Sequence, residues 1–375
     1  MAQNTLFRIT DWLPFWSSLL LFALGWFAIL TGGYAFLIVV AFIWYVVPIL
    51  DQLMSQAKNN FDPDMDENGL AQFMLITKIW PLLQFILIFG GLWVLEQRDD
   101  AFAFQMGAFF AIGMITGTVG INYSHELMHQ KNNFERNLAD VLLAMTLYSH
   151  FRSEHLLVHH RYVGTPRDPV TARFNEGFHN FFWRVIVQCW TSAFRAEKEM
   201  LQRKGLPWHD PSNPFWRYWA LQGLFLALAF TIGGISGLLL FVFQATTAIF
   251  HLELVNYIEH YGLTRKHLGN GKYEPVLPHH SWNAEHKAAN WMLINLQRHS
   301  DHHYKPNRRY PLLQTYDGSI APQLPYSYPF MGLFAFFPPV WHRMMNHRVR
   351  KWRSMYYPEI TDWSSYNKMT NPKPR

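Results

Sequence analysis

Cysteine is almost absent from this sequence, because Cys189 is the only one in 375 residues. A single thiol excludes a disulfide framework, a thiolate zinc site and a fused electron-transfer module of the CxxC type. Charged residues are also scarce at 15% of the chain, against about 25% in ordinary globular proteins. The first residues lack a basic segment leading to a small-residue cleavage site, so no cleavable signal peptide is expected. No nucleic-acid motif accompanies the net charge of +6, and a nucleic-acid partner is therefore not expected.

Hydrophobic residues, in contrast, make up half of the chain and form long runs. A helix that crosses about 30 Å of hydrocarbon needs roughly 20 apolar residues. Four runs are long enough, and a fifth, longer run over 218–257 is interrupted at Gly233-Gly234 and therefore counts as two spans. The alternative is a soluble protein with buried core helices. The sequence predicts an all-α polytopic membrane protein with a single domain (1–375) and six spans, at 12–30, 34–50, 73–95, 101–123, 218–232 and 236–257.

The basic residues indicate which ends of these spans share a side. Of 32 Lys and Arg residues, twelve lie between 130 and 217 and sixteen lie after 259. With six spans both stretches fall on one side of the membrane, and the positive-inside rule makes that side cytoplasmic. Residues 124–217 and 258–375 are therefore expected to form one cytoplasmic region.

That region contains three histidine clusters, within a chain that has 19 histidines. Spacings of three and four residues place side chains on one helical face, about 5–6 Å apart. A lone HxxxH pair is expected by chance, whereas an HxxxHH triplet is not. Neutral imidazole binds iron, zinc or copper, and eight or nine histidines imply two metal ions. The clusters are His125-Glu-Leu-Met-His129, His155-Leu-Leu-Val-His159-His160 and His299-Ser-Asp-His302-His303.

A polar stripe on the last span points to the same place. Glu253, Asn256 and His260 share one face of an otherwise apolar helix, and ionisable groups at membrane depth are candidates for function. The alternative is a structural stripe whose polar groups satisfy one another. The nearby carboxylates could bind metal or hold imidazole N–H groups in place, and we favour the second role. These carboxylates are Glu126, Glu154, Glu259 and Asp301.

Two other functional classes compete with a polynuclear metal enzyme. His125-Glu126-Leu-Met-His129 matches HExxH, the zinc protease signature, but a protease needs only two of these histidines and one further ligand. A transporter with a histidine-lined path would place its ligands near the membrane midplane, whereas these lie at the ends of spans.

The clusters in combination resemble a known family. HELMH, EHLLVHH, NYIEHYG and LQRHSDHH (296–303) are similar to the signature segments of integral-membrane alkane 1-monooxygenases, which share a superfamily with membrane desaturases and xylene monooxygenases. Gln130 and Leu156-Leu157-Val158 depart from the usual pattern and bear on the preferred substrate. The resemblance implies a di-iron centre with ligands at His125, His129, His155, His159, His160, His260, His299, His302 and His303.

The resemblance also implies the reaction. It predicts hydroxylation of the terminal methyl group of medium-chain n-alkanes with O₂, in the inner membrane of a bacterium. Electrons would come from rubredoxin, reduced in turn by an NAD(P)H-dependent reductase. A xylene monooxygenase and a fatty acyl desaturase or hydroxylase are the alternatives within the superfamily.

An alkane has no polar group, so its selection depends on the shape of a channel. Trp44 lies seven residues before Asp51, about 10 Å into the membrane at 1.5 Å per residue, which is comparable to a medium-chain alkane. We therefore expect Trp44 to limit chain length, with Asn122 as a second channel residue. A tryptophan that faces lipid or packs in the core is the alternative.

Overall fold

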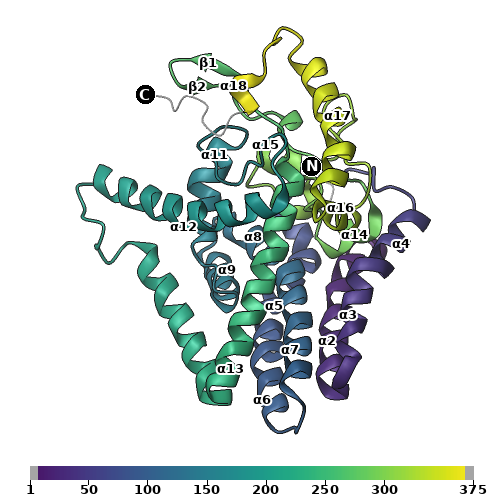
Figure 1. Cartoon of the computed structure of the whole chain (residues 1–375), viewed down its shortest axis with the longest axis vertical. Helices are drawn as coiled ribbons and strands as arrows, with labels where there is room; N and C mark the ends of the chain where they lie inside the picture. The colour runs from purple at the N-terminus through teal and green to yellow at the C-terminus, as the bar shows by residue number, and fades with distance from the viewer. Residues whose placement is uncertain (1–6, 368–375) are drawn as a thin grey trace.

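The computed structural model describes residues 7–367, and it is predominantly helical. Figure 1 shows a bundle of long helices with a cap of short helices and loops at one end. Five of the described helical stretches are long and apolar enough to cross a membrane. They confirm a multi-pass membrane protein and are Ile9–Thr31, Gly33–Leu53, Ala71–Glu96, Phe102–Met128 and Pro214–His260.

Several of these stretches contain a short π-helical or 3₁₀ turn, and each piece has its own label. The first two stretches are α1 (Ile9–Trp12), η1 (Leu13–Ser17), α2 (Ser18–Thr31), η2 (Gly33–Phe36), α3 (Leu37–Ala41), η3 (Phe42–Val46) and α4 (Val47–Leu53). After η4 (Glu67–Leu70), the next two are α5 (Ala71–Phe85), η5 (Ile86–Gly90), α6 (Gly91–Glu96), α7 (Phe102–Ile115), η6 (Thr116–Ile121) and α8 (Asn122–Met128).

The fifth stretch, α13 (Pro214–His260), has two arms, as the Gly233-Gly234 break predicts. Gly233 has φ −127° and ψ 18°, and Gly234 has φ 56° and ψ −141°, so neither is helical. Gly234 occupies a region that side chains with a Cβ rarely adopt. Figure 1 shows the two arms meeting at the end of the bundle opposite the cap. The second arm therefore returns His260 to the capped end.

Glycines allow α7 and η6 to pack closely against the second arm of α13. A Cβ on Gly113 would lie 2.6 Å from the carbonyl oxygen of Gln244, and one on Gly117 would lie 2.9 Å from Ala248 Cα. Small residues four apart are the usual means by which membrane helices approach one another. This contact aligns α8, which carries His125, with the end of α13, which carries His260.

The rest of the described chain, from its middle and its last segment, forms the cap and the helices next to it, in which short elements alternate with the longer helices α9, α12 and α17. Its only strands among residues 7–367, β1 (His267–Gly269) and β2 (Lys272–Tyr273), form an antiparallel hairpin. The central segment provides α9 (Asn133–Met145), α10 (Phe151–Glu154), η7 (His155–His159), α11 (His160–Tyr162) and α12 (Phe178–Arg203). The last segment provides η8 (Pro278–His280), α14 (Lys287–Met292), α15 (His299–Tyr304), η9 (Tyr310–Leu312), α16 (Tyr328–Ala335), α17 (Pro338–Tyr356) and α18 (Ser364–Asn367).

Buried polar contacts fasten the cap to the bundle. Asp51, at the end of the second stretch, accepts a hydrogen bond from the backbone N–H of Ala289 at 3.0 Å. Arg309 forms an ion pair with Glu135 at 3.0 Å, with both side chains almost fully buried. Tyr310 donates its hydroxyl to the carbonyl oxygen of Phe73 at 2.9 Å. Breaking one partner of a buried pair is costly, so these contacts hold the cap in one position.

Candidate metal centre

Five helical elements bring the nine predicted histidines to the junction of bundle and cap. His125 lies on α8 and His129 directly follows it, whereas His260 is the last residue of α13. Eight of the nine are buried, and His160 is partly buried. The central and last segments of the cap supply the other six, His155, His159, His160, His299, His302 and His303.

The nine histidines form two groups, in each of which the ligand atoms all lie within 4.8 Å of one another. In the larger group, His155 Nε2 lies 3.0 Å from the Nε2 atoms of both His125 and His129. In the smaller group, His299 Nε2 lies 3.1 Å from that of His260 and 3.0 Å from that of His303. The larger group is His125, His129, His155, His160 and His302, and the smaller is His159, His260, His299 and His303.

A π-helical turn divides the second cluster between the two groups. A π-helix aligns residues five apart rather than four. His155 begins η7 and His160 directly follows it, and their Nε2 atoms accordingly lie 2.9 Å apart. His159, the last residue of η7, belongs to the other group. Simple α-helical spacing, which the sequence analysis assumed, would instead pair His155 with His159. Turns of this kind are frequent at functional sites.

The third cluster is divided in the same way by an ordinary α-helix. On α15, His299 and His303 are one turn apart and belong to the smaller group. His302 faces the larger group, where its Nε2 lies 3.0 Å from that of His160. The second and third clusters therefore each serve both groups, and the rings of His160 and His303 lie with centroids 4.6 Å apart where the groups adjoin.

The geometry of both groups fits metal ions. Two nitrogens bound at right angles to one ion, each about 2.1 Å from it, lie about 3.0 Å apart. The neighbouring Nε2 atoms are 2.9–3.2 Å apart, which matches that distance. If no metal ion lay between them, the lone pairs of the unprotonated nitrogens would face and repel one another. An all-imidazole donor set suits iron, zinc or copper. The residues present therefore fit two ions of this kind.

Burial also keeps the histidines in the form that binds metal. Imidazole must be neutral to act as a ligand. Burial, reinforced by the charge of neighbouring imidazoles, holds the pKa of the cap histidines well below its ordinary value. This applies to His155, His160, His299, His302 and His303.

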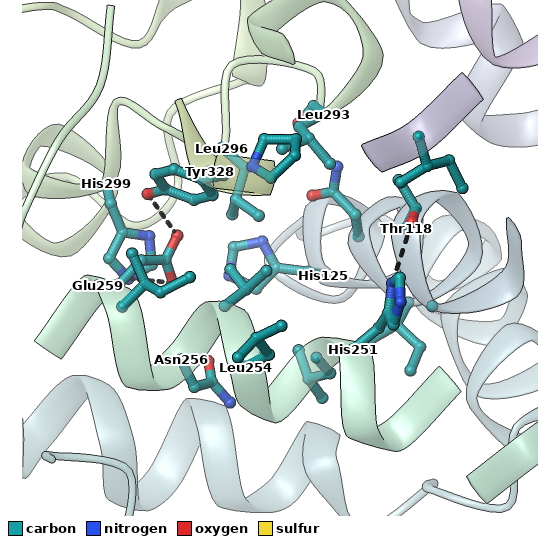
Figure 2. A pocket seen from close by; sticks show the side chains of 18 of the residues that line it. Thr118, His125, His251, Leu254, Asn256, Glu259, Leu293, Leu296, His299 and Tyr328 are labelled. Atoms are coloured by element: carbon teal, nitrogen blue, oxygen red, sulfur yellow. Dashed lines mark hydrogen bonds and ion pairs between the residues drawn. The ribbon is translucent and has the colours of Figure 1, made fainter. Parts of the chain in front are cut away.

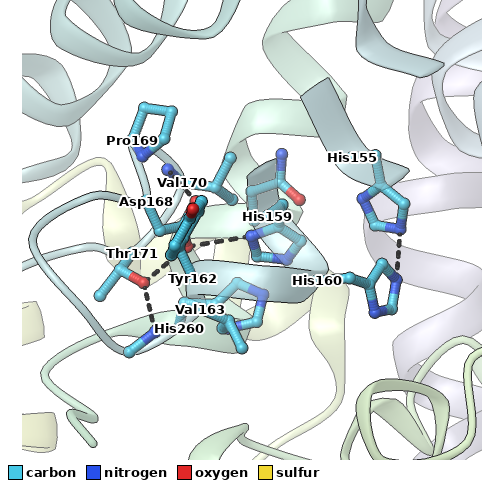
Figure 3. Close-up of polar contacts among 12 residues, drawn as sticks. His155, His159, His160, Tyr162, Val163, Asp168, Pro169, Val170, Thr171 and His260 are labelled. Carbon is cyan, nitrogen blue, oxygen red and sulfur yellow. Dashed lines mark hydrogen bonds and ion pairs between the residues drawn. The ribbon is translucent and has the colours of Figure 1, made fainter. Parts of the chain in front are cut away.

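Asp168 orients His159, and the sequence analysis did not identify it. Its carboxylate lies 3.0 Å from His159 Nδ1, as Figure 3 shows. Thr171 donates its hydroxyl to the same carboxylate oxygen at 2.7 Å, and the backbone N–H of Val170 donates to the other at 3.1 Å. A carboxylate on Nδ1–H leaves the Nε2 lone pair free for metal. The only sequence signal was its place nine residues after His159.

Glu259 and Glu253, from the predicted polar stripe, occupy different positions. Glu259 Oε2 lies 3.3 Å from His299 Nε2, while Tyr328 donates to Glu259 Oε1 at 2.8 Å (Figure 2). Glu253 accepts hydrogen bonds from Tyr148 at 2.8 Å and from Asn256 at 3.0 Å. Glu259 therefore touches a candidate ligand, and Glu253 with Asn256 forms a polar layer below it.

The other three predicted carboxylates also lie beside the histidines in sequence. Glu126 accepts from Gln130 at 3.0 Å. Asp301 accepts from Arg308 at 2.7 Å and from the backbone N–H of Gln314 at 2.9 Å, so these contacts hold the loop that follows α15. Glu154 is fully buried, and neither carboxylate oxygen has a hydrogen-bond partner within residues 7–367. Burial, with the nearby charges of Asp168 and Glu253, raises the pKa of Glu154 well above its ordinary value.

A third potential group, Glu274 with His279 and His280, is better explained by hydrogen bonding. His280 Nδ1 accepts the backbone N–H of Leu277 at 2.9 Å, which places the ring proton on Nε2 in the neutral form. That Nε2 then donates toward Tyr357, 2.8 Å away, and cannot bind a metal. Burial alone would raise the pKa of Glu274. Hydrogen bonds from His280, the backbone N–H of Lys266 and Tyr357 outweigh burial and hold this pKa at about 2.

An apolar pocket runs from the metal groups into the bundle. His125, His155 and His299 line it on the side of the metal groups. Trp44 and Asn122, the two predicted channel residues, both line it. Asn122 donates its amide to the carbonyl oxygen of Leu293 at 2.7 Å. Pockets with apolar walls and a few placed polar groups are typical of sites for small molecules.

Known proteins are similar to this chain in sequence. The family model described as fatty acid desaturase matches residues 101–335. Alkane 1-monooxygenase 2 of Pseudomonas aeruginosa is 37% identical over 333 residues, covering 87% of this chain and 87% of its own length. Alkane 1-monooxygenase 2 of Alcanivorax borkumensis is 33% identical, covering 82% of this chain and 81% of its own. The chain belongs to the alkane 1-monooxygenase family. It is therefore a membrane oxidoreductase of the monooxygenase class, as the histidine motifs predicted.

Membership of the family bears on the competing interpretations. The xylene/toluene monooxygenase hydroxylase component of Pseudomonas putida is 29% identical over 78% of this chain. It is thus similar as well, at lower identity than the alkane 1-monooxygenases named above. The protease interpretation of His125 and His129 is not supported, because both belong to a group of five histidines.

Proposed function

We propose that the protein is a non-haem di-iron monooxygenase that hydroxylates the terminal methyl group of medium-chain n-alkanes to primary alcohols. The observation that carries this proposal is the position of two groups of imidazole nitrogens at the inner end of an apolar pocket in a membrane bundle. The names of the similar proteins support alkanes as the substrate class.

Iron would be held by the five-histidine and the four-histidine group, one ion in each. When bound, the iron pair supplies the redox chemistry that activates O₂ for insertion of one oxygen atom into a C–H bond. The balanced reaction joins an alkane, O₂, two electrons and two protons to give the alcohol and water. An imidazole set fits iron, and the resemblance of the motifs to di-iron enzymes favours iron over zinc or copper.

The protein itself would contribute position, shape and exclusion of water. The apolar walls of the pocket bind a hydrocarbon by burying it, and they direct one end toward His125 and His299. Because one methylene changes binding in such a pocket by only about 1–3 kcal/mol, a range of chain lengths is expected rather than a single substrate.

We further propose six membrane crossings with the metal groups at the cytoplasmic face of a bacterial inner membrane. The two arms of α13 would each cross, which adds one crossing to the five apolar stretches. The cap then lies on the side that carries 28 of the 32 basic residues, as the positive-inside rule requires. Rubredoxin, supplied by a NAD(P)H-dependent reductase, is our proposed electron donor, since the chain has no cysteine cluster of its own.

Metal analysis together with product identification tests the proposal. The purified protein should contain about two irons per chain and convert n-octane to n-octanol. His302→Ala, in the larger group, and His159→Ala, in the smaller group, should each lose iron and activity while still inserting in membranes. The matched control is His347→Ala on the exposed side of α17, which should keep both irons.

Two results would overturn the assignment. Full iron content in both ligand variants would show that these histidines do not bind the metal. Oxidation of xylenes or desaturation of acyl chains without any alcohol from n-alkanes would move the protein to another branch of the superfamily.

A further inference from the structure

The pocket has a polar end that the oxidation of alkanes does not require. Figure 2 shows His125 and His299 on the metal side, and His251 with Thr118 at the opposite side. Both His251 and Thr118 line the pocket and are partly exposed to it. Trp44 packs edge-on against the His251 ring, with centroids 5.5 Å apart.

The polar end lies at a distance that suits one medium-length chain. His251 precedes His260 by nine residues on the same arm of α13, which corresponds to about 13 Å at 1.5 Å per residue. Gly117 and Thr118 precede His125 on η6 and α8 by a similar distance. A substrate with its methyl group near the metals would therefore place its other end near His251.

The hydrogen bonding of His251 leaves one nitrogen available. Its Nδ1 lies 3.4 Å from Thr118 Oγ1, and within residues 7–367 its Nε2 has no hydrogen-bond partner. If the Thr118 hydroxyl donates to Nδ1, the neutral ring carries its proton on Nε2 and can donate it. With this tautomer His251 Nε2 is a donor that has no acceptor among residues 7–367, and a polar group in an apolar, membrane-embedded site is costly unless it is paired.

We propose that His251, oriented by Thr118, binds an uncharged oxygen at the end of the substrate that is remote from the metals. Through this contact His251 acts as a positioning residue, which holds a medium-chain ether or ester with its hydrocarbon end toward the metal groups. This inference rests on the proposed function, because it concerns the same pocket and the same oxidation of a terminal methyl group. The oxygen-bearing chain is hydroxylated at its far methyl with the same balance of O₂, two electrons and two protons.

A matched pair of substrates isolates the effect. n-Hexyl methyl ether has the same number of heavy atoms as n-octane, with one methylene replaced by oxygen. Bound in the proposed direction it is hydroxylated at the hexyl end and yields a methoxy-alcohol. Bound in reverse it is hydroxylated at the methoxy carbon and breaks down to hexanol and formaldehyde. The ratio of these products reports orientation and does not depend on how much of the enzyme is active.

The ratio should favour the methoxy-alcohol in the unaltered enzyme. His251→Leu removes the donor, and Thr118→Val removes the group that orients it; each should lower the ratio by about threefold to tenfold, the effect of one hydrogen bond. His251→Gln keeps an N–H donor and should restore part of the preference. Thr246→Val is the control, since this hydroxyl lies on the exposed side of α13 and donates to the carbonyl oxygen of Val242 at 2.9 Å, within its own helix.

Binding provides a second measurement. The affinity of the unreduced enzyme for the ether relative to n-octane should fall by a similar factor in His251→Leu. An unchanged product ratio together with unchanged relative affinity in His251→Leu and Thr118→Val would overturn the inference. Failure of the unaltered enzyme to oxidise n-octane would instead overturn the proposed function, so the two failures are distinguishable.

Discussion

At the scale of single residues, the metal groups depend on side chains that fix the orientation of the ligands. Asp168 is the clearest example, because its carboxylate is held by Thr171 and Val170 and meets only one of the nine histidines. A ligand whose second nitrogen is held this way has one tautomer and one ring position. A substitution of Asp168 should therefore affect metal binding in the smaller group alone.

Asp168→Asn should weaken metal binding in the smaller group by about 10- to 100-fold, because an amide no longer selects the Nδ1–H tautomer of His159. The measurement is iron per chain during titration with a chelator, in which one of the two irons should leave first. Asp210→Asn, on an exposed turn, is the control. Equal resistance to the chelator in Asp168→Asn and the unaltered protein would contradict the role assigned to Asp168.

Trp44 is a second single residue on which the site depends. It lines the pocket, and its ring packs against His251, Phe336 and Gly332. Trp44→Ser should let longer alkanes bind, because removal of the ring extends the space below the polar end of the pocket. The test is the distribution of alcohols formed from an equal mixture of n-alkanes, which should shift toward longer chains. An unchanged distribution would leave Trp44 as a packing residue.

At the scale of secondary-structure elements, the site depends on how closely η6 approaches α13. Gly117 faces Ala248 and His251 with no room for a side chain. Gly117→Ala should destabilise the protein by about 1–3 kcal/mol, the usual cost of overpacking. The change is measured as the thermal midpoint in detergent.

The control for this helix contact is another helical glycine. A Cβ at Gly223, on the first arm of α13, would meet nothing within 4 Å. Gly223→Ala should therefore be neutral or slightly stabilising, because alanine favours the helix. If both substitutions had the same effect, close packing at Gly117 would not be the cause.

At the scale of the whole molecule, basic charge gathers on the side where the metal groups lie. Residues 130–217 and 260–367, which form the cap and its neighbouring loops, carry 25 of the 29 basic residues in the described part of the chain, and charge of one sign steers a partner of the other sign. Basic residues at a membrane face also set the topology and contact anionic lipid, and these roles are compatible with the steering of a partner.

Turnover with dilute rubredoxin, the acidic donor that we propose, should fall steeply as salt is added. The screening length falls from about 10 Å at 0.1 M to 3 Å at 1 M, so the apparent Michaelis constant for rubredoxin should rise. Activity driven by a small uncharged reductant should change far less. Equal salt sensitivity with both donors would show that charge does not steer the docking.

The class of the protein and the identity of the clustered histidines could be predicted from the sequence alone. Apolar runs of spanning length define a membrane protein whatever the packing, because the bilayer imposes that length. The sequence also predicted the break in α13 at Gly233-Gly234, because two adjacent glycines in an apolar run mark a place where a helix bends. Paired histidines at short spacing were informative because spacing along a helix is a local property.

The division of those histidines into two groups became visible in the folded chain alone. The spacing of an ordinary α-helix pairs His155 with His159, whereas the π-helical turn pairs His155 with His160. A π-helical turn adds one residue to the helix, and the sequence of this segment gives no sign of that extra residue. Asp168 and His251 likewise escaped notice, because each acts through a partner brought to it by the fold. A lone aspartate or histidine has no periodicity, so its role depends on contacts between segments that are distant in sequence.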